Sequence, residues 1–314
     1  MNILLFGANG QVGFALREPL AELGRLICAT RSGALDDDGP CVSVDLADSR
    51  SLANALDASG AKIIVNAAAY TAVDRAEDET DLADRVNHRA VAEMGEWAAR
   101  NEALVIHYST DYVFDGNSER PWHENDATAP LGVYGRSKLA GEQALRDSGA
   151  QHLILRTAWV YAARGQNFLR TMLRVAAERE ELRVVDDQVG APTSAGWIAR
   201  TTANVLRRWL AMGVQEREMA LGTYHLTASL RCSWFGFADQ IMREAHDAGL
   251  HEKIPRMIPI TSADYPTRAT RPAFSVLDNA KLTLVFGQQQ QPWQEGLHEV
   301  IGELAATRSH GDVS

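Results

Sequence analysis

Short apolar runs alternate with amphipathic stretches over the first half of the chain. The runs are typical of buried strands, and the stretches between them repeat their apolar positions with the period of a helix. We expect strands at Asn2–Phe6, Arg25–Thr30, Cys41–Val44, Lys62–Asn66, Ala103–Ser109 and His152–Thr157, and helices at Gln11–Leu23, Asp48–Ser59, Asp81–Asn101 and Tyr134–Ser148. This alternation predicts an α/β fold, in which helices cover both faces of a doubly wound parallel sheet.

The pattern changes beyond Tyr161, where helices dominate and strands are few. We expect helices at Asn167–Glu180, Ser194–Met212, Ser233–Ala248 and Pro292–Ala306, and short strands at Leu182–Val185 and Thr223–Thr227. The strands are too few for a second full sheet. The chain is therefore predicted to form a Rossmann-type domain over residues 1–160 and a smaller mixed α/β lobe over residues 161–306. Residues 307–314 are expected to be a disordered tail.

Composition separates the chain from nucleic-acid-binding and membrane proteins. Of its 314 residues 46% are hydrophobic, and the formal net charge of −10 leaves no basic face for nucleic acid. No window approaches the roughly 20 apolar residues of a membrane span, and the first ten residues lack the basic segment of a signal peptide. The cysteines Cys28, Cys41 and Cys232 show no metal-ligand spacing. We expect a cytoplasmic protein with reduced thiols and neither nucleic acid nor membrane as a partner.

A glycine-rich turn, G-A-N-G-Q-V-G, follows the first predicted strand and opens the first predicted helix. Gly7 permits the tight turn, Gly10 lets a pyrophosphate approach the backbone, and Gly13 allows the helix to pack close to the sheet. The helix N-terminus adds N–H groups and a partial positive charge. The position of this turn at the first strand predicts dinucleotide binding.

The residues after the second strand indicate which dinucleotide is bound. A carboxylate there would bind the ribose 2′-hydroxyl of NADH, but the chain reads Thr30-Arg31-Ser32. Arg31 is suited to a 2′-phosphate, so NADPH is favoured and NADH is possible. Asp45 and Leu46, after the third strand, are candidates to flank the adenine.

Tyr134 and Lys138 stand four residues apart at the start of a predicted helix, so both side chains project from one face. We expect the ammonium to lower the pKa of the phenol, which then donates a proton to a developing alkoxide. The fifth strand ends in Tyr108-Ser109-Thr110-Asp111, and a hydroxyl there can bind the substrate carbonyl. His107 and His225 fall in strands and are expected to be core or edge residues.

These motifs resemble the extended branch of the short-chain dehydrogenase/reductase superfamily over essentially the whole chain. Within that branch, six segments are similar to the dTDP-4-dehydrorhamnose reductase (dTDP-L-rhamnose synthase) family. They are N-A-A-A-Y-T-A-V-D at Asn66–Asp74, S-T-D-Y-V-F-D-G at Ser109–Gly116, Y-G-R-S-K-L-A-G-E at Tyr134–Glu142, R-T-A-W-V-Y at Arg156–Tyr161, Q-V-G-A-P-T at Gln188–Thr193 and R-P-A-F-S-V-L-D at Arg271–Asp278.

The resemblance implies NADPH-dependent reduction of the C4 keto group of dTDP-6-deoxy-β-L-lyxo-4-hexulose to dTDP-β-L-rhamnose. It implies a catalytic triad of Thr110, Tyr134 and Lys138, in which Lys138 also holds the nicotinamide ribose. The expected cofactor contacts, which include the residues named above, are Gly7, Asn9, Gly10, Gln11, Val12, Gly13, Arg31, Asp45, Leu46, Ala67, Ala68, Ala69, Tyr70, Asn87, Tyr134 and Lys138. The expected contacts to the dTDP-sugar are Asp111, Tyr112, Val113, Trp159, Gly190, Ala191, Pro192, Thr193 and Arg271.

Other activities of the same fold stay open to different degrees. A sugar-nucleotide 4,6-dehydratase needs an acid/base pair after the threonine, usually Asp-Glu, and here the pair is Asp111-Tyr112. A reductase of a different dTDP-4-keto-6-deoxysugar is one alternative. A non-catalytic NADP(H)-binding subunit, resembling the regulatory subunit of methionine adenosyltransferase, is another, although the triad argues for chemistry.

Metal and oligomeric state are less constrained by the residues. No ligand cluster with metal spacing is evident, so no metal is predicted, while a cation such as Mg²⁺, which some relatives are thought to need, stays open. No heptad or exposed apolar stripe decides between a monomer and a homodimer.

Overall fold

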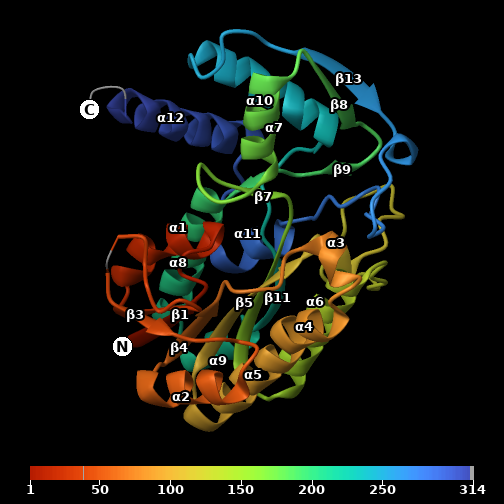
Figure 1. The fold of residues 1–314 in the computed structure, drawn as a ribbon. Helices are drawn as coiled ribbons and strands as arrows, with labels where there is room; N and C mark the ends of the chain where they lie inside the picture. Colours follow the sequence, from red (N-terminus) through yellow and green to blue (C-terminus); the bar gives the residue numbers. More distant parts are fainter. Residues whose placement is uncertain (38, 312–314) are drawn as a thin grey trace.

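A computed structural model describes residues 1–37 and 39–311, with the backbone alone for 309–311. Its centre is a seven-stranded parallel sheet with the strand order β11-β6-β5-β4-β1-β2-β3 (Figure 1). The strands are β1 (Asn2–Phe6), β2 (Arg25–Thr30), β3 (Cys41–Ser43), β4 (Ile63–Asn66), β5 (Leu104–Thr110), β6 (Gln151–Thr157) and β11 (Gly222–His225). The predicted α/β fold is confirmed, and the first six strands lie within one residue of their predicted ends.

Successive residues of the strands are buried in two separate cores, one on each face of the sheet. On one face Ile3 and Leu5 of β1 pack with α1 (Gln11–Ala21) and α8 (Ala195–Ala211). On the other face Leu4 and Phe6 pack with α2 (Ser49–Ser59), α5 (Ala90–Asn101) and α6 (Val133–Asp147). Burial on both faces explains why the strands are continuously apolar.

The sheet extends beyond the boundary predicted after residue 160. Strand β11 adds to the sheet beside β6, with Tyr224 opposite Leu155. Helices α8 and α11 (Ala280–Phe286) pack in the same core, and α9 (Val214–Met219) precedes β11 in the chain. The prediction placed this segment in the second lobe, because nothing in its sequence tells which sheet a short strand joins.

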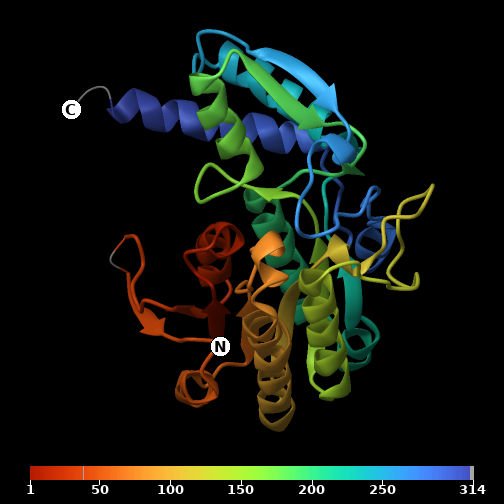
Figure 2. The same cartoon turned by 45° about the vertical axis from the view of Figure 1, so that its right-hand side comes forward.

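The remaining residues form a smaller lobe at one end of the sheet, above β7 (Val160–Tyr161) in Figure 1 and in the turned view of Figure 2. Its parallel strands β8 (Glu181–Val185) and β13 (Arg256–Ile260) pack with α7 (Phe168–Glu178), α10 (Trp234–Asp247) and α12 (Trp293–Gly311). Helix α12 continues through residues 307–311, where a disordered tail was predicted, and 312–314 lie outside the described residues.

Short elements connect these units. The helix predicted over Asp81–Asn101 is interrupted: α4 (Thr80–Asp84) is followed by a π-helical turn, Arg85–Arg89, and then by α5. The other short elements are α3 (Val73–Ala76), β9 (Val189–Gly190), β10 (Thr193–Ser194), β12 (Cys232–Ser233) and the 3₁₀ turns Asp111–Val113 and Ser262–Asp264. Among the helices that the structure describes, none combines the length and the apolar character of a membrane span.

Candidate active site

The turn after β1 leaves no room for a side chain at Gly7 or Gly13. Gly7 has a φ of +77°, and a Cβ there would lie 2.8 Å from the amide nitrogen of Ala68. A Cβ on Gly13 would lie 2.0 Å from the carbonyl oxygen of Gly7. Gly10 stands at the N-cap of α1 without a side chain, so the backbone amides of the first helical turn are open to an anion. This cradle fits the pyrophosphate of a dinucleotide.

The other residues predicted around the cofactor differ in their exposure and in their contacts. Asn9 donates to the carbonyl of Ala34, and Gln11 accepts a hydrogen bond at 2.8 Å from Asn167, which ties the turn to the second lobe. Arg31 is exposed at the end of β2. Leu46, in contrast, is buried in the core beside α2. The predicted contacts Val12, Asp45, Ala67, Ala68 and Ala69 lie at the start of α1 or just after β3 and β4.

Asn87 holds the loop after β4 against helix α6. It accepts from the amide of Tyr70 at 2.9 Å and donates to the carbonyl of Tyr70 at 3.0 Å and to Ser137 at 3.1 Å. Asn87 is fully buried, and it lies in the π-helical turn, an irregularity common at functional sites. A Cβ on Gly141 would lie 2.1 Å from the carbonyl oxygen of Asn87, so helix and turn are in direct contact.

Thr110 and Tyr134 meet where β5 ends. Thr110 Oγ1 donates to the carboxylate of Asp111 at 2.9 Å, and hydrogen bonding with Thr110 lowers the pKa of Tyr134. Burial has the larger effect and raises the pKa of Tyr134 to about 12. The ring of Tyr112 packs edge-on against Tyr134, with the centroids 5.5 Å apart. The phenol is therefore held protonated beside the polar side chains of Thr110 and Asp111.

The buried side chain of Lys138 does not act on this phenol as predicted. Its Nζ donates to the carbonyl of Tyr108 at 2.6 Å and lies 3.3 Å from His107 Nε2. Burial lowers the pKa of Lys138 to about 8, partly offset by Glu142. The expectation that the ammonium lowers the pKa of Tyr134 is wrong, because desolvation of the phenol dominates.

Asp111 and Arg271 both lie near Tyr112. Burial raises the pKa of the Asp111 carboxyl to about 6, and the pKa of Tyr112 rises above its usual range, opposed by the charge of Arg271. Arg271 pairs with Asp74 at 3.0 Å. Val113 also follows Thr110, but its side chain is fully buried against the core and is not offered to a ligand.

Trp159 lies in a stack of aromatic rings rather than on an open wall. Its indole is parallel to that of Trp234, with the centroids 3.5 Å apart. A Cβ on Gly190 would lie 2.4 Å from the Trp159 ring, so only glycine fits there. The predicted Ala191, Pro192 and Thr193 are buried, and Thr193 accepts from the amide of Ala228 at 3.1 Å.

Several residues that support the site were not predicted. Glu77 accepts from the amide of Val133, Asn66 bonds to His107, and Glu142 forms a buried ion pair with Arg156. Glu142 belongs to a quoted motif, but no spacing connects Glu77 with a helix that begins 56 residues later. Such contacts depend on the tertiary fold.

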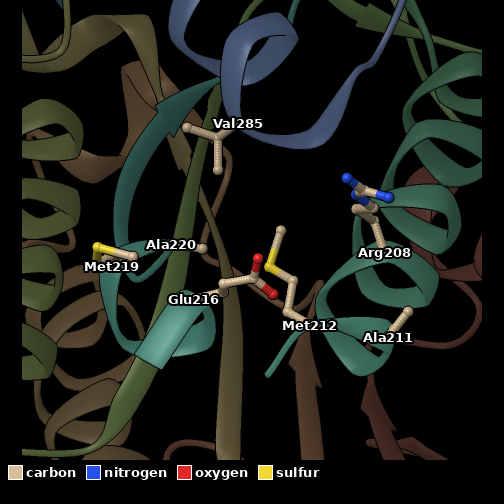
Figure 3. Close-up of a pocket in the computed structure, with 7 residues that line it drawn as sticks. All are labelled: Arg208, Ala211, Met212, Glu216, Met219, Ala220 and Val285. Carbon is tan, nitrogen blue, oxygen red and sulfur yellow. The ribbon is translucent and has the colours of Figure 1, made fainter. Parts of the chain in front are cut away.

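A surface hollow lies away from these residues. It has a volume of about 440 Å³ and opens between α8, α9 and α11, lined by residues such as Arg208, Met212 and Glu216 (Figure 3). No predicted site residue lines it. Within the described part of the chain, no group of three or more His, Cys, Asp or Glu side chains is placed to hold a metal ion.

The parallel sheet, its glycine turn and the tyrosine–lysine helix beside β5 define a Rossmann-type oxidoreductase of the extended short-chain dehydrogenase/reductase class. The chain belongs to the RmlD substrate binding domain family, whose model matches residues 1–306.

Relatives of similar length share the fold and the sequence. A dTDP-4-dehydrorhamnose reductase of Escherichia coli K12 is 44% identical over 307 residues, covering 98% of this chain and 99% of the relative. The crystal structure of a dTDP-4-dehydrorhamnose reductase from Clostridium acetobutylicum has a TM-score of 0.85 and 33% identity, over 97% of this chain and 99% of that one. The reductase from Bacillus anthracis, in complex with NADP, has a TM-score of 0.83 and 31% identity, over 96% and 99%.

Proposed function

We propose that the chain catalyses NADPH-dependent reduction of the C4 keto group of dTDP-6-deoxy-β-L-lyxo-4-hexulose (dTDP-4-dehydrorhamnose) to dTDP-β-L-rhamnose. The observation that carries this proposal is the protonated phenol of Tyr134, held beside Thr110 at the end of β5. A ketone reduction needs a proton donor there and a dinucleotide cradle nearby, and the chain has both. Its family, with full-length relatives named for this reaction, supports the choice of substrate.

The residues that would hold NADPH are those of the glycine turn, with Arg31 toward a 2′-phosphate and Lys138 toward the nicotinamide ribose. When bound, NADPH supplies a hydride to the carbonyl carbon. Tyr70 and Asn87 keep the loop after β4 in place beside this site through their paired hydrogen bonds.

Thr110 and Tyr134 act on the carbonyl oxygen. Tyr134 donates a hydrogen bond to it, and Thr110 does so once its hydroxyl turns from Asp111 to the substrate, which stabilises the negative charge that develops there. The pKa of Tyr134, near 12, keeps the phenol protonated at neutral pH, so it can give its proton to the alkoxide. Lys138, with a pKa near 8, carries a positive charge at neutral pH in most molecules and stabilises the phenolate that results.

The substrate contacts stay part of the proposal. Among the predicted contacts, Tyr112 packs against Tyr134 and interacts electrostatically with Asp111 and Arg271. Arg271 can exchange its partly exposed pair with Asp74 for a pyrophosphate oxygen. The stacked Trp159 and the buried 190–193 segment would shape the wall of the second lobe.

The test is turnover of the purified protein. With NADPH and the keto sugar nucleotide, we expect loss of NADPH absorbance and a product that NMR identifies as dTDP-β-L-rhamnose. Tyr134→Phe should lower kcat at least about 100-fold with NADPH affinity nearly intact, because only the proton donor is lost. Binding of NADPH without turnover would favour the regulatory-subunit alternative, and an isomeric product a different reductase.

A cytoplasmic location and a monomeric or homodimeric state complete the proposal. Both are predictions from the sequence. Light scattering of the purified protein decides between monomer and dimer.

A further inference from the structure

Three buried polar side chains form a row behind the catalytic helix. Asn66 of β4 lies opposite His107 of β5, and Asn66 Nδ2 is 3.1 Å from His107 Nδ1. The other ring nitrogen, Nε2, is 3.3 Å from Lys138 Nζ on α6. All three side chains are at most 2% exposed. Because these side chains are buried, each donor needs an acceptor in the row or on the adjoining backbone.

A backbone amide determines the orientation of this row. The N–H of Ala68, which can only donate, points at Asn66 Oδ1 at 3.2 Å. The amide nitrogen of Asn66 therefore faces His107 and donates to Nδ1. A neutral imidazole carries one proton, so that proton is on Nε2 and is directed at Lys138 Nζ.

This arrangement fits a neutral amine and not an ammonium. An ammonium group has three donors and no lone pair, so it cannot accept from His107 Nε2. A neutral amine accepts that proton and still donates to the carbonyl of Tyr108. If Lys138 is charged, His107 must carry its proton on Nδ1, and the Asn66 amide must turn its oxygen from Ala68 toward the ring. The amide of Ala68 then faces a donor.

We propose that His107 is a positioning residue whose tautomer is coupled to the charge of Lys138, and that it disfavours the ammonium form. Its effect on turnover rests on the proposed function, while the coupling itself does not. In the reduction, His107 would thus determine the pH above which Lys138 no longer stabilises the Tyr134 phenolate.

Other charged and titratable groups on the neighbouring elements also influence the pKa values of Lys138 and His107. From α6, Glu142 raises the pKa of Lys138, and it is paired with Arg156 of β6. From β5, the phenol of Tyr108 is bonded to Thr202 rather than directed at the row. Burial, together with Lys138, keeps the pKa of His107 well below its usual range, so the ring stays neutral and only its tautomer changes.

Two substitutions test the coupling through the pH profile. Asn66→Asp presents only acceptors, which favours the proton on Nδ1 and frees Nε2 to accept from an ammonium. His107→Gln replaces the imidazole, which has two tautomers, with an amide whose oxygen can accept a hydrogen bond from Lys138 Nζ. In both variants the basic limb of kcat/KM at saturating NADPH should move up by about one pH unit. A role in folding alone would lower activity without moving this limb.

NMR spectroscopy detects the tautomer of His107 directly, without a measurement of turnover. The nine histidines are labelled with ¹⁵N, and the signal that disappears in His107→Gln is assigned to His107. We expect Nδ1–H at about pH 6 and Nε2–H at about pH 10. One tautomer throughout, or an unmoved basic limb in both active variants, would overturn the proposal. An inactive wild-type protein with a switching tautomer would overturn only the proposed function.

Discussion

The carboxylate of Glu77 accepts a hydrogen bond from the backbone amide of Val133 at 2.8 Å and caps the helix that carries Tyr134 and Lys138. The N-cap of that helix is Gly132, which has no side chain to do so. A Cβ on Gly132 would lie 2.6 Å from Glu77 Oε1, so the glycine makes room for the carboxylate. The negative charge also interacts favourably with the N-terminal end of the helix dipole.

Removal of this cap should loosen the first turn of α6. We expect Glu77→Ala to lower the free energy of unfolding by about 1 kcal/mol and to reduce kcat more than NADPH affinity, because the first turn positions Tyr134. Urea unfolding and steady-state kinetics measure the two effects. Asp81→Ala, at an exposed carboxylate of the same acidic stretch, is the matched control. Equal behaviour of the two variants would contradict the capping role.

Glu142 and Arg156 form an ion pair beneath the same helix. Arg156 donates to both carboxylate oxygens, at 2.9 and 2.7 Å, and both residues are at most 2% exposed. Glu142→Gln leaves the guanidinium buried with a weaker partner, so we expect a loss of about 3 kcal/mol in the free energy of unfolding. The double variant Glu142→Leu/Arg156→Met removes both charges and should recover most of that loss. If the double variant is the less stable of the two, the pair itself stabilises the fold.

The central strands β1, β4, β5 and β6 were predictable because they are buried on both faces and read as continuous apolar runs. Strand β13 (Arg256–Ile260) was missed, since Pro259 and its surroundings indicate a loop. Its pairing with β8 keeps this strand at the edge of a two-stranded sheet, where a proline is tolerated. The π-helical turn Arg85–Arg89 was missed because a single inserted residue barely alters the helical period.

The site was predictable where chemistry lies in local motifs, as in the glycine turn and the four-residue spacing of Tyr134 and Lys138. Spacing shows that two side chains share a helix face, but not what else surrounds them. The side-chain nitrogen of Lys138 donates to the carbonyl of Tyr108 and lies beside the ring of His107, and both of these groups come from β5. The pKa of Tyr134 thus depends on tertiary contacts.

Arg31 should decide between NADPH and NADH. Arg31→Ala removes the cation from the end of β2, so we expect NADPH affinity to fall about tenfold or more while NADH affinity changes little. Fluorescence titration of both dinucleotides measures this. Arg25→Ala, at an exposed arginine at the start of the same strand, is the control. Equal losses for NADPH and NADH would indicate that Arg31 does not contact the 2′-phosphate.

The buried carboxyl of Asp111 should destabilise the folded protein at neutral pH. Its pKa is raised by burial from 3.8 in the unfolded chain to about 6 in the fold, so the native state binds the proton more tightly. The stabilisation that this group contributes is complete below pH 3.8 and is lost as the pH rises through 6. Above that pH the charged carboxylate costs about 3 kcal/mol, an order-of-magnitude value from the shift of about two units.

Asp111→Asn should therefore match the wild type in stability near pH 4 and become more stable by up to about 3 kcal/mol above pH 6. Urea unfolding at a series of pH values gives the difference. Asp126→Asn is the contrast, because the Arg120 guanidinium holds the pKa of Asp126 well below its usual range, so that variant should lose stability as the pH rises. A pH-independent difference for Asp111→Asn would mean that the carboxyl is hydrated in the fold. If the Asp111 carboxylate contacts the sugar, Asp111→Asn should gain stability and lose turnover. The fold then tolerates the cost of burying this charge because the charge serves substrate binding.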